Sequence, residues 1–258
     1  MAVLLAASLR LHFPRHIDLI AAHPTFFGEL RPETKRALAS LDVVIVPICN
    51  PLGADFLIGH KLAALMLIGG PDLGLFLDTD MLAMGAPEPL PNSIAARVAG
   101  SNQHTAAVWK YVYESFDLAV PTAGPATVIS GETTAPYYNS GMISVPGYLA
   151  GRLVATWIET AARIDADPSV PLSSKRPWLD QLSLPIAAAR LGLPIELLDP
   201  KWNFPAGWRT SDHGMPILLH YRRALRIKEE EVAMTAAAQA ADIMPSVREA
   251  LAAFSFID

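Results

Sequence analysis

Two carboxylates separated by one residue are the part of the sequence with the clearest chemical potential. Asp78 and Asp80 flank Thr79 directly after the apolar run Leu73–Leu77. A short apolar run of this kind is typical of a buried strand, and open α/β sheets bind ligands at the carboxyl ends of their strands. Carboxylate oxygens suit Mg²⁺ or Mn²⁺, which often keep a diphosphate in their coordination shell. Asp78 and Asp80 are therefore candidate metal ligands.

The same triplet also suits a purely structural role. Short polar side chains are common in turns, where they cap the helix that follows. The spacing alone favours neither interpretation.

Helix-like and strand-like patterns alternate around this triplet. Helical patterns occupy residues 3–11, a segment starting near Pro32, and residues 61–68, 106–116, 148–164 and 178–190. Strand-like runs occupy residues 17–22, 43–48, 73–77, 139–145, 194–198 and 217–220. The alternation predicts a single α/β domain with a mixed, mainly parallel sheet and helices packed on its faces.

The composition limits the classes of function. Of 258 residues, 52% are hydrophobic and 17% are charged, which is ample material for a compact core. The net charge of −5 and the lack of a long basic run argue against a nucleic-acid partner. The longest uncharged stretch, residues 133–151, contains two prolines and an Asn-Ser pair, so no transmembrane segment is expected.

Cys49 is the only cysteine, so an internal disulfide and a cysteine-rich zinc site are both excluded. Its apolar flank, residues 44–48, predicts a small buried residue within a strand. A reducing compartment fits best, and a cytoplasmic location is expected.

The C-terminal residues predict a helical tail. Residues 222–241 suit a weakly amphipathic helix, with Leu225, Val232 and Gln239 at heptad spacing. Ser246 and Glu249 have the spacing of a capping box that opens a last short helix. We expect a catalytic domain over residues 1–221 and a tail over residues 222–258 that packs on it.

The sequence around the two aspartates resembles a known signature. Phe76 to Met81 is similar to the Asp-x-Asp motif of nucleotide-sugar glycosyltransferases with the GT-A fold. Further segments narrow the resemblance to the glycogenin-like glycosyltransferase family 8. These segments, in family order, are Lys61 before the motif, Asn139-Ser140-Gly141, Asp180-Gln181, Trp202-Asn203, and His220 after a late strand.

The resemblance implies a GT-A-like fold and a reaction. A sugar would pass from a nucleotide-diphosphate donor, with a UDP-sugar expected, to an unidentified acceptor, with retention at the anomeric carbon. Asp78, Asp80 and His220 would hold Mn²⁺ or Mg²⁺ on the donor diphosphate. The implied catalytic residues are Lys61, Asn139, Asp180 and Gln181. The implied donor-binding residues are Asp78, Thr79, Asp80, Lys61, Trp202, Asn203 and Arg222.

Each of these segments also has an ordinary structural interpretation. Asn139 suits a turn before a glycine, and Asp180 an exposed first helical turn, where the dipole favours acid. His220 suits a satisfied core histidine, and Trp202 a packing residue. Without the resemblance, these interpretations would be preferred.

The sequence departs from the family at two places. The family begins with a strand that holds the nucleotide base, whereas this chain starts in what resembles the following helix, so that first strand is expected to be missing. The family also follows its histidine with a glycine and a lysine that grip the diphosphate. Here Tyr221, Arg222 and Arg223 follow, so Arg222 or Arg223 is expected to substitute.

Two alternatives remain open. A haloacid-dehalogenase-like phosphatase would use Asp78 as its nucleophile, but Leu82 stands where that family has Thr or Val, and its later acidic motifs are missing. A degenerate, non-catalytic nucleotide-sugar binder is compatible with the short N-terminus. Phosphate-binding and dinucleotide-binding glycine motifs are absent from the sequence.

Overall fold

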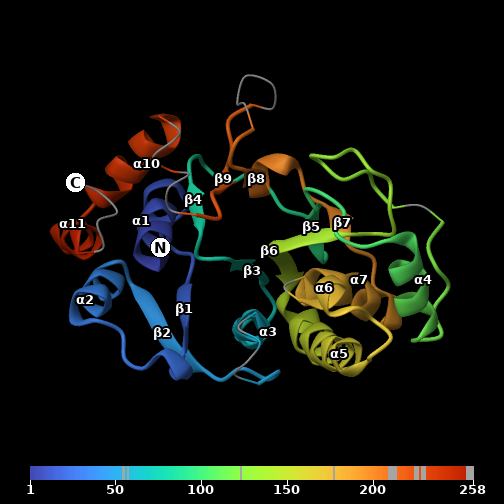
Figure 1. Ribbon diagram of the computed structural model, residues 1–258. Coiled ribbons are helices and arrows are strands. Elements are labelled where there is room, and N and C mark those ends of the chain that lie inside the picture. The colour runs from blue at the N-terminus through green and yellow to red at the C-terminus, as the bar shows by residue number, and fades with distance from the viewer. Residues whose placement is uncertain are drawn as a thin grey trace. The chain divides into compact units, whose positions relative to one another are not determined.

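The computed structural model describes residues 1–53, 56, 58–122, 124–176, 178–208, 214–223, 227 and 231–253. These residues form two compact units (Figure 1). Unit 1 comprises Met1–Cys49, Leu77–Pro89 and Asp199–Asp258. Unit 2 comprises Asn50–Phe76 and Leu90–Leu198.

Unit 1 contains two small sheets. Strands β1 (Leu19–Pro24) and β2 (Val43–Ile48) pair in parallel. In the second sheet, β9 (Leu218–His220) lies between β4 (Met81–Ala83) and β8 (Phe204–Pro205). The β4 strand is antiparallel to β9 and β8 is parallel to it. Two short 3₁₀ helices, η1 (Thr25–Phe27) and η2 (Pro200–Asn203), complete the connections.

The part of unit 1 that the structure describes has four helices with full bounds beside these sheets. They are α1 (Ala2–His12), α2 (Pro32–Ser40), α10 (Glu231–Ala241) and α11 (Pro245–Ala252). Helix α1 is apolar on nearly all sides and contributes Val3, Leu4 and Ala7 to a core shared with α2, α10 and α11. Helices α10 and α11 therefore pack on α1 and α2.

The predicted capping box is wrong. Helix α11 begins two residues earlier, with Met244 at its N-cap. The Ser246 hydroxyl instead lies 2.7 Å from the hydroxyl of Ser40, and Glu249 pairs with Arg36 at 2.9 Å. These contacts hold α11 against α2. The side chains of Ser246 and Glu249 therefore bind residues of α2 instead of the helix end that they were predicted to cap. Of the predicted heptad residues, Leu225 and the side chain of Val232 lie outside the described part of the chain.

Unit 2 is built on a sheet with the strand order β3-β6-β5-β7. The strands are β3 (Leu73–Leu77, whose last residue begins the next segment of unit 1), β5 (Ala95–Val98), β6 (Tyr138–Pro146) and β7 (Glu196–Leu197). All nine residues of β6 are buried. The β5 and β6 strands are antiparallel, with a register shift between Ala96 and Arg97.

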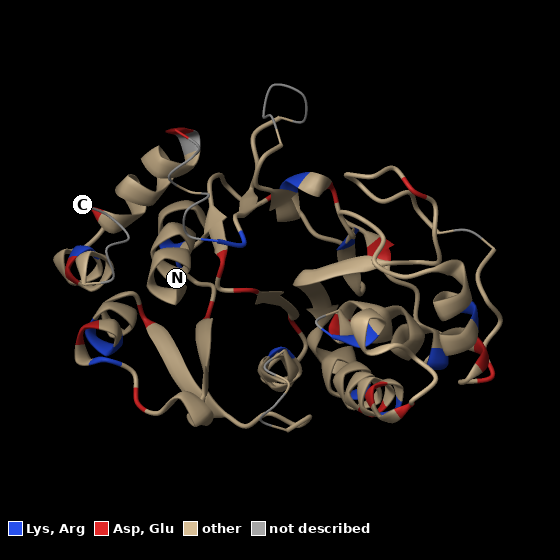
Figure 2. Ribbon diagram, in the orientation of Figure 1, with Lys and Arg blue, Asp and Glu red and all other residues tan. Residues whose placement is uncertain are grey.

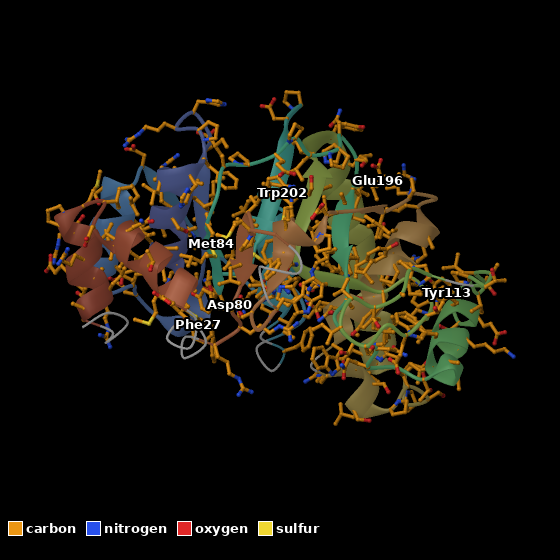
Figure 3. The ribbon with its side chains drawn as sticks, turned by 90° about the horizontal axis from the view of Figure 1, so that it is seen from above. Phe27, Asp80, Met84, Tyr113, Glu196 and Trp202 are labelled. Atoms are coloured by element: carbon orange, nitrogen blue, oxygen red, sulfur yellow. The ribbon has the colours of Figure 1, made fainter. Side chains whose placement is uncertain are left out.

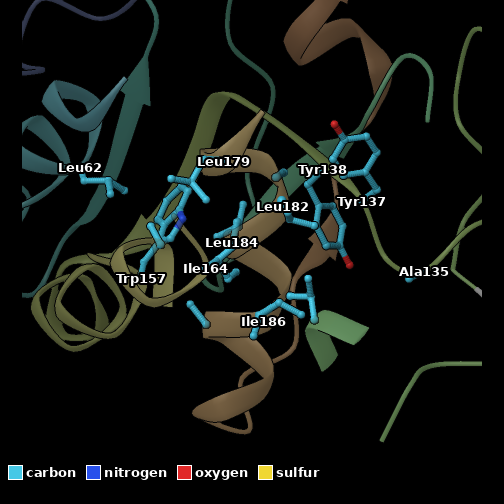
Figure 4. Packing of buried hydrophobic residues seen from close by; sticks show 14 of the residues in the cluster. Leu62, Ala135, Tyr137, Tyr138, Trp157, Ile164, Leu179, Leu182, Leu184 and Ile186 are labelled. Carbon is cyan, nitrogen blue, oxygen red and sulfur yellow. The ribbon is translucent and has the colours of Figure 1, made fainter. Parts of the chain in front are cut away.

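Among the described residues of unit 2, five helices accompany this sheet. They are α3 (Gly59–Leu65), α4 (Ala106–Glu114), α5 (Gly147–Ala166), α6 (Leu172–Lys175) and α7 (Leu179–Arg190). Helices α5 and α7 pack closely on each other, and Figure 4 shows Trp157 of α5 in the same cluster as Leu179 and Leu182 of α7. Strands β1, β2, β3 and β6 contain no Lys, Arg, Asp or Glu, and the charges fall mainly on helices and connecting segments (Figure 2).

The predicted α/β class with mixed sheets is confirmed. Two expectations are wrong. Cys49 is exposed, because β2 ends at Ile48 and the cysteine lies beyond it. Asp78 to Asp80 cap no following helix, because the next element is β4. Among the described helices, none has the length and apolar character that a bilayer crossing requires.

Candidate functional site

A cluster of side chains that could hold a metal ion lies in unit 1. Asp78, Asp80 and His220 each offer a ligand atom, and these atoms all lie within 4.8 Å of one another. Both aspartates are half-buried and the histidine is buried. Asp80 directly precedes β4, beside which it lies in Figure 3. The structure thus brings together the three residues predicted to hold a metal.

The pairing of β4 with β9 explains why residues so distant in sequence meet. Met81 pairs with His220 in the antiparallel register. The backbone N–H of Tyr221 donates to the carbonyl of Asp80 at 3.0 Å, which extends the pairing by one step. The backbone of Asp80 is therefore held next to the end of β9, the strand that carries His220.

Tyr221 also holds the turn between the two aspartates. Its hydroxyl donates to the carbonyl of Thr79 at 3.3 Å. Burial raises the pKa of Tyr221, and the negative charge of Asp80 raises it further. The phenol therefore stays protonated and remains a donor at neutral pH. The Thr79 side chain itself is exposed, and it is the carbonyl of this residue that has a defined role.

Asn203 determines which nitrogen of His220 faces the acids. The amide oxygen of Asn203 lies 3.0 Å from Nδ1 of His220, and Nε2 lies 3.4 Å from Oδ1 of Asp80. Because a carbonyl oxygen only accepts, this contact assigns the proton to Nδ1. The lone pair on Nε2 is then directed toward the carboxylates, as in histidines that ligate metals.

The donor set fits a divalent cation. Ligand atoms that share one ion lie about 2.0–2.3 Å from it, so they lie at most about 4.6 Å apart. The observed limit of 4.8 Å is close to this value, and the pair Asp80 and His220 is already closer. Two carboxylate oxygens and one imidazole suit Mn²⁺ or Mg²⁺ and leave positions for phosphate oxygens or water.

A second polar cluster lies in unit 2. The ammonium of Lys61, on α3, donates to Oδ2 of Asp180 at 3.0 Å and to the hydroxyl of Ser140 at 3.1 Å. Ser140, on β6, donates to the same carboxylate oxygen at 2.5 Å. The side chain of Asp180 is only 3% exposed, so the lysine compensates a buried charge. Sequence reasoning places Asp180 on an exposed helical turn when the resemblance is set aside, and that placement is wrong.

The remaining candidates of unit 2 are less tightly joined to this cluster. Asn139 is buried, and its side-chain oxygen accepts from the backbone N–H of Gly141 at 3.0 Å. This contact is local, and it lies within β6 and not in the turn that the sequence also suggested. Gln181 is half-buried on the first turn of α7, next to Asp180.

The other donor-binding candidates lie in unit 1. Trp202 is buried and meets the ring of Phe13 edge to face at 6.2 Å, which is a packing role. Arg222 and Arg223 are both exposed. Arg222 has a φ of 59°, and the N–H of Arg223 bonds the carbonyl of Tyr221 at 2.6 Å. A tight turn therefore follows the histidine directly.

Sequence reasoning missed Ser140, Tyr221 and the orienting role of Asn203. Ser140 stands inside the quoted Asn-Ser-Gly segment, so that segment pointed to the region without identifying the hydroxyl. The contacts of Tyr221 and Asn203 depend on the register of β9 with its neighbours. No local sequence pattern records that register.

Comparison with known proteins places the chain among glycosyltransferases. Residues 1–192 match the family model described as the Rhodobacterales glycosyltransferase domain. His220 and Asn203 lie beyond the matched residues. A search of the curated proteins finds no match.

Two solved structures share the fold. An apo structure of WbbM, a bifunctional glycosyltransferase, has a TM-score of 0.50 and 13% identity over 92% of this chain and 49% of that one. The glycosyltransferase GlyE of Streptococcus pneumoniae TIGR4 has a TM-score of 0.53 and 13% identity over 100% of this chain and 62% of that one.

The chain thus spans about half to three fifths of the length of these proteins. At this identity the likeness concerns the fold, and it confirms the expected GT-A-like architecture. The narrower resemblance to the glycogenin-like family 8 stays a prediction. Because the family model covers well over half of the sequence, the chain belongs to the Rhodobacterales glycosyltransferase domain family.

Proposed function

We propose that the protein transfers a sugar from a nucleotide-diphosphate donor, a UDP-sugar, to an acceptor, with Mn²⁺ or Mg²⁺ and with retention at the anomeric carbon. The observation that carries the proposal is the cluster of Asp78, Asp80 and His220 in a chain of a glycosyltransferase family. These three side chains come from two distant segments, and β4 and β9 position them together.

The residues of unit 1 would serve the diphosphate. Asp78, Asp80 and His220 would hold the ion, which when bound neutralises phosphate charge. Asn203 orients His220, and Tyr221 holds the turn at Thr79. Arg222, exposed in the tight turn after His220, offers a guanidinium suited to phosphate oxygens, while the buried ring of Trp202 supports the site by packing.

The residues of unit 2 would serve the sugar and the leaving group. Lys61 offers positive charge for the departing phosphate, and Asn139, Asp180 and Gln181 offer polar groups for sugar hydroxyls. The contact of Lys61 with Asp180 supports this assignment, because it restricts where the ammonium of Lys61 can lie.

The phosphatase alternative has no support in this chain. The comparisons place the sequence in a glycosyltransferase family, and β3, which precedes Asp78, is the third strand rather than the first. The non-catalytic binder differs from the transferase only in turnover, so one set of measurements separates them.

Titration calorimetry with UDP- and GDP-sugars, with and without Mn²⁺, tests the proposal. We expect binding of a UDP-sugar that depends on the metal, followed by slow release of UDP when the complex is incubated. Binding without release would favour the non-catalytic binder. Metal-independent binding, or none, would contradict the proposal.

Replacement of Asp80 by Asn provides the matching variant. Its charge holds the ion, so we expect Asp80→Asn to lose metal-dependent donor binding by at least a hundredfold. The matched control is Asp18→Asn, an exposed aspartate that precedes β1 in the same unit, and it should bind as the wild type does. Equal affinities for both variants would remove Asp80 from the metal site.

A further inference from the structure

Within the residues that the structure describes, two of the buried polar atoms in unit 2 that lack a hydrogen-bond partner belong to Tyr137 and Asp180. They are the hydroxyl of Tyr137 and Oδ1 of Asp180. Both residues are almost wholly buried, at 1% and 3% exposure. Buried polar atoms in folded proteins are nearly always paired, directly or through an ordered water, because an unpaired one destabilises the fold. A donor and an acceptor in this condition therefore require an explanation.

The two groups lie in the same part of unit 2. Tyr137 belongs to the cluster that contains Leu179 and Leu182, the residues on either side of Asp180 and Gln181 in α7 (Figure 4). Burial raises the pKa of Tyr137, and the charge of Asp180 raises it further. The phenol of Tyr137 is thus protonated and able to donate, and it lies within range of an electrostatic interaction with the carboxylate of Asp180.

The ring of Tyr137 is firmly held. Its backbone carbonyl accepts from the N–H of Ala99 at 2.9 Å. The edges of His104 and Trp109 meet the ring at centroid distances of 5.2 and 5.4 Å. Because the ring is fixed, the hydroxyl of Tyr137 has one position. A polar group with a fixed position can orient another side chain.

The carboxylate of Asp180 has one oxygen atom without a hydrogen-bond donor among the described residues. Its Oδ2 atom already accepts from Lys61 and Ser140, which leaves Oδ1 for another donor. A carboxylate held at one oxygen can still rotate, and rotation would move Oδ2 away from the ammonium of Lys61. A donor on Oδ1 prevents this motion, and hydrogen bonds to a carboxylate are among the stronger ones.

We propose that Tyr137 is a positioning residue whose hydroxyl donates to one buried water, which in turn donates to Oδ1 of Asp180 and so keeps Oδ2 on Lys61 and Ser140. The effect on the donor rests on the proposed function, since Lys61 and Asp180 are assigned to the sugar and leaving group there. The hydrogen bond itself does not rest on it and is tested separately.

A double-mutant cycle in thermal unfolding tests the hydrogen bond. If the hydroxyl of Tyr137 is unpaired, Tyr137→Phe removes a buried unsatisfied group and leaves the melting temperature unchanged or higher. If it holds Asp180, the melting temperature falls by about 2–4 °C. The fall must disappear when Asp180 is already Asn, because only coupled residues show non-additive effects.

Tyr113→Phe is the matched control, as Tyr113 is a buried tyrosine of the same core. Its effect should be equal in the two backgrounds. A Tyr137→Phe protein that melts at or above the wild-type temperature, or an effect that persists in the Asp180→Asn background, overturns the proposal. Should Asp180→Asn fail to fold, the single substitution still decides by the sign of its shift.

Calorimetry with Mn²⁺, comparing UDP with UDP-glucose, measures the effect on the donor. We expect Tyr137→Phe to bind UDP as the wild type does and to lose about five- to tenfold of the additional affinity for UDP-glucose. If Tyr137→Phe binds UDP normally and keeps the full additional affinity for UDP-glucose, the positioning role is overturned. If wild-type protein binds neither ligand, the proposed function fails, and the unfolding cycle alone decides whether Tyr137 holds Asp180.

Discussion

The amide of Asn203 orients the imidazole of His220, which belongs to the proposed metal site. It holds Nδ1 at 3.0 Å and leaves Nε2 directed to Asp80. Asn203 is fully buried, so its orientation is fixed by the surrounding core. Groups of this kind commonly change metal affinity by 10- to 100-fold when they are removed.

Replacement of Asn203 by Ala should therefore weaken Mn²⁺ binding by about 10- to 100-fold, because the imidazole loses its orientation. Asn203→Asp keeps an acceptor oxygen at the same place and should retain most of the affinity. Direct Mn²⁺ titration of the two variants and the wild type measures the effect. Wild-type affinity in Asn203→Ala would show that the contact has no orienting role.

His104 makes the stability of the protein sensitive to acid. It is 3% exposed, and burial lowers its pKa to about 4 from the ordinary value near 6.5. Above pH 6.5 the histidine is neutral in both the folded and the unfolded chain. Between pH 6.5 and 4 only the unfolded chain takes up a proton, so the free energy of unfolding falls as the pH falls.

Urea unfolding at pH 7.5 and pH 4.5 measures this effect. We expect the wild type to lose on the order of 2–3 kcal/mol through His104 alone. His104→Phe keeps an aromatic ring beside Trp109 and Tyr137 but cannot titrate, so its loss over the same interval should be smaller by that amount. Equal losses in the two proteins would mean that His104 does not titrate below its ordinary pKa.

At the scale of elements, the start of α5 lies against the loop before β3. The N–H of Gly147 donates to the carbonyl of Asp72 at 2.8 Å. A methyl group on Gly147 would lie 2.6 Å from the backbone oxygens of both Gly69 and Gly70. Only glycine allows this approach, so the residue type at position 147 determines how closely helix and loop can pack.

Gly147→Ala should lower the free energy of unfolding by about 1–3 kcal/mol, because backbone must move to admit the methyl group. Gly151→Ala, one turn later in the same helix, has open space around the new methyl and should raise it by about 0.5–1 kcal/mol. Denaturant unfolding of the pair measures both. Effects of the same sign would contradict the close approach at Gly147.

Elements were predictable where the local sequence alone decides them. The apolar runs of β2 and β3 end at turn-forming residues, and the structure reproduces both ranges without change. Strands β4, β5 and β8 were not predicted, because strands of two to four residues carry too little pattern. The capping box failed because Ser246 has a tertiary partner in Ser40.

In the site, too, some features could be predicted from local sequence and others depend on the fold. The spacing of Asp78 and Asp80 is visible in the sequence, whereas His220 could be joined to them only through the family resemblance. The contacts of Asn203 and Tyr221 required the pairing of β9, which is a property of the fold. Residues that act through a strand register far away in the chain leave no local pattern to detect.

At the scale of the whole molecule, the chain enters unit 1 three times and unit 2 twice. The metal-binding side chains all belong to unit 1, and the cluster of Lys61, Ser140 and Asp180 belongs to unit 2. The proposed metal and sugar functions are thus carried by different units, and they should respond to different ligands.

Hydrogen exchange with and without Mn²⁺ tests this division. The metal alone should slow exchange in residues 77–83 and 218–222, since it joins the ligands at the ends of β3 and β9. Residues 139–146 of unit 2 should be unaffected until a UDP-sugar is added. Protection of β6 by Mn²⁺ alone would contradict the assignment of the ion to the Asp78, Asp80 and His220 cluster.

The pairing of β4 with β9 also constrains how the chain folds during its synthesis. Unit 2 has all its residues once position 198 has emerged from the ribosome, whereas β4 must wait for β9, more than 130 residues behind it. At the usual speed of translation this delay is on the order of 10 s. Throughout it, the apolar helix α1 and the buried face of β4 lack the partners that α10, α11 and β9 supply. These apolar surfaces therefore stay uncovered for that interval, and a metal could be captured at the proposed site only after β9 has emerged.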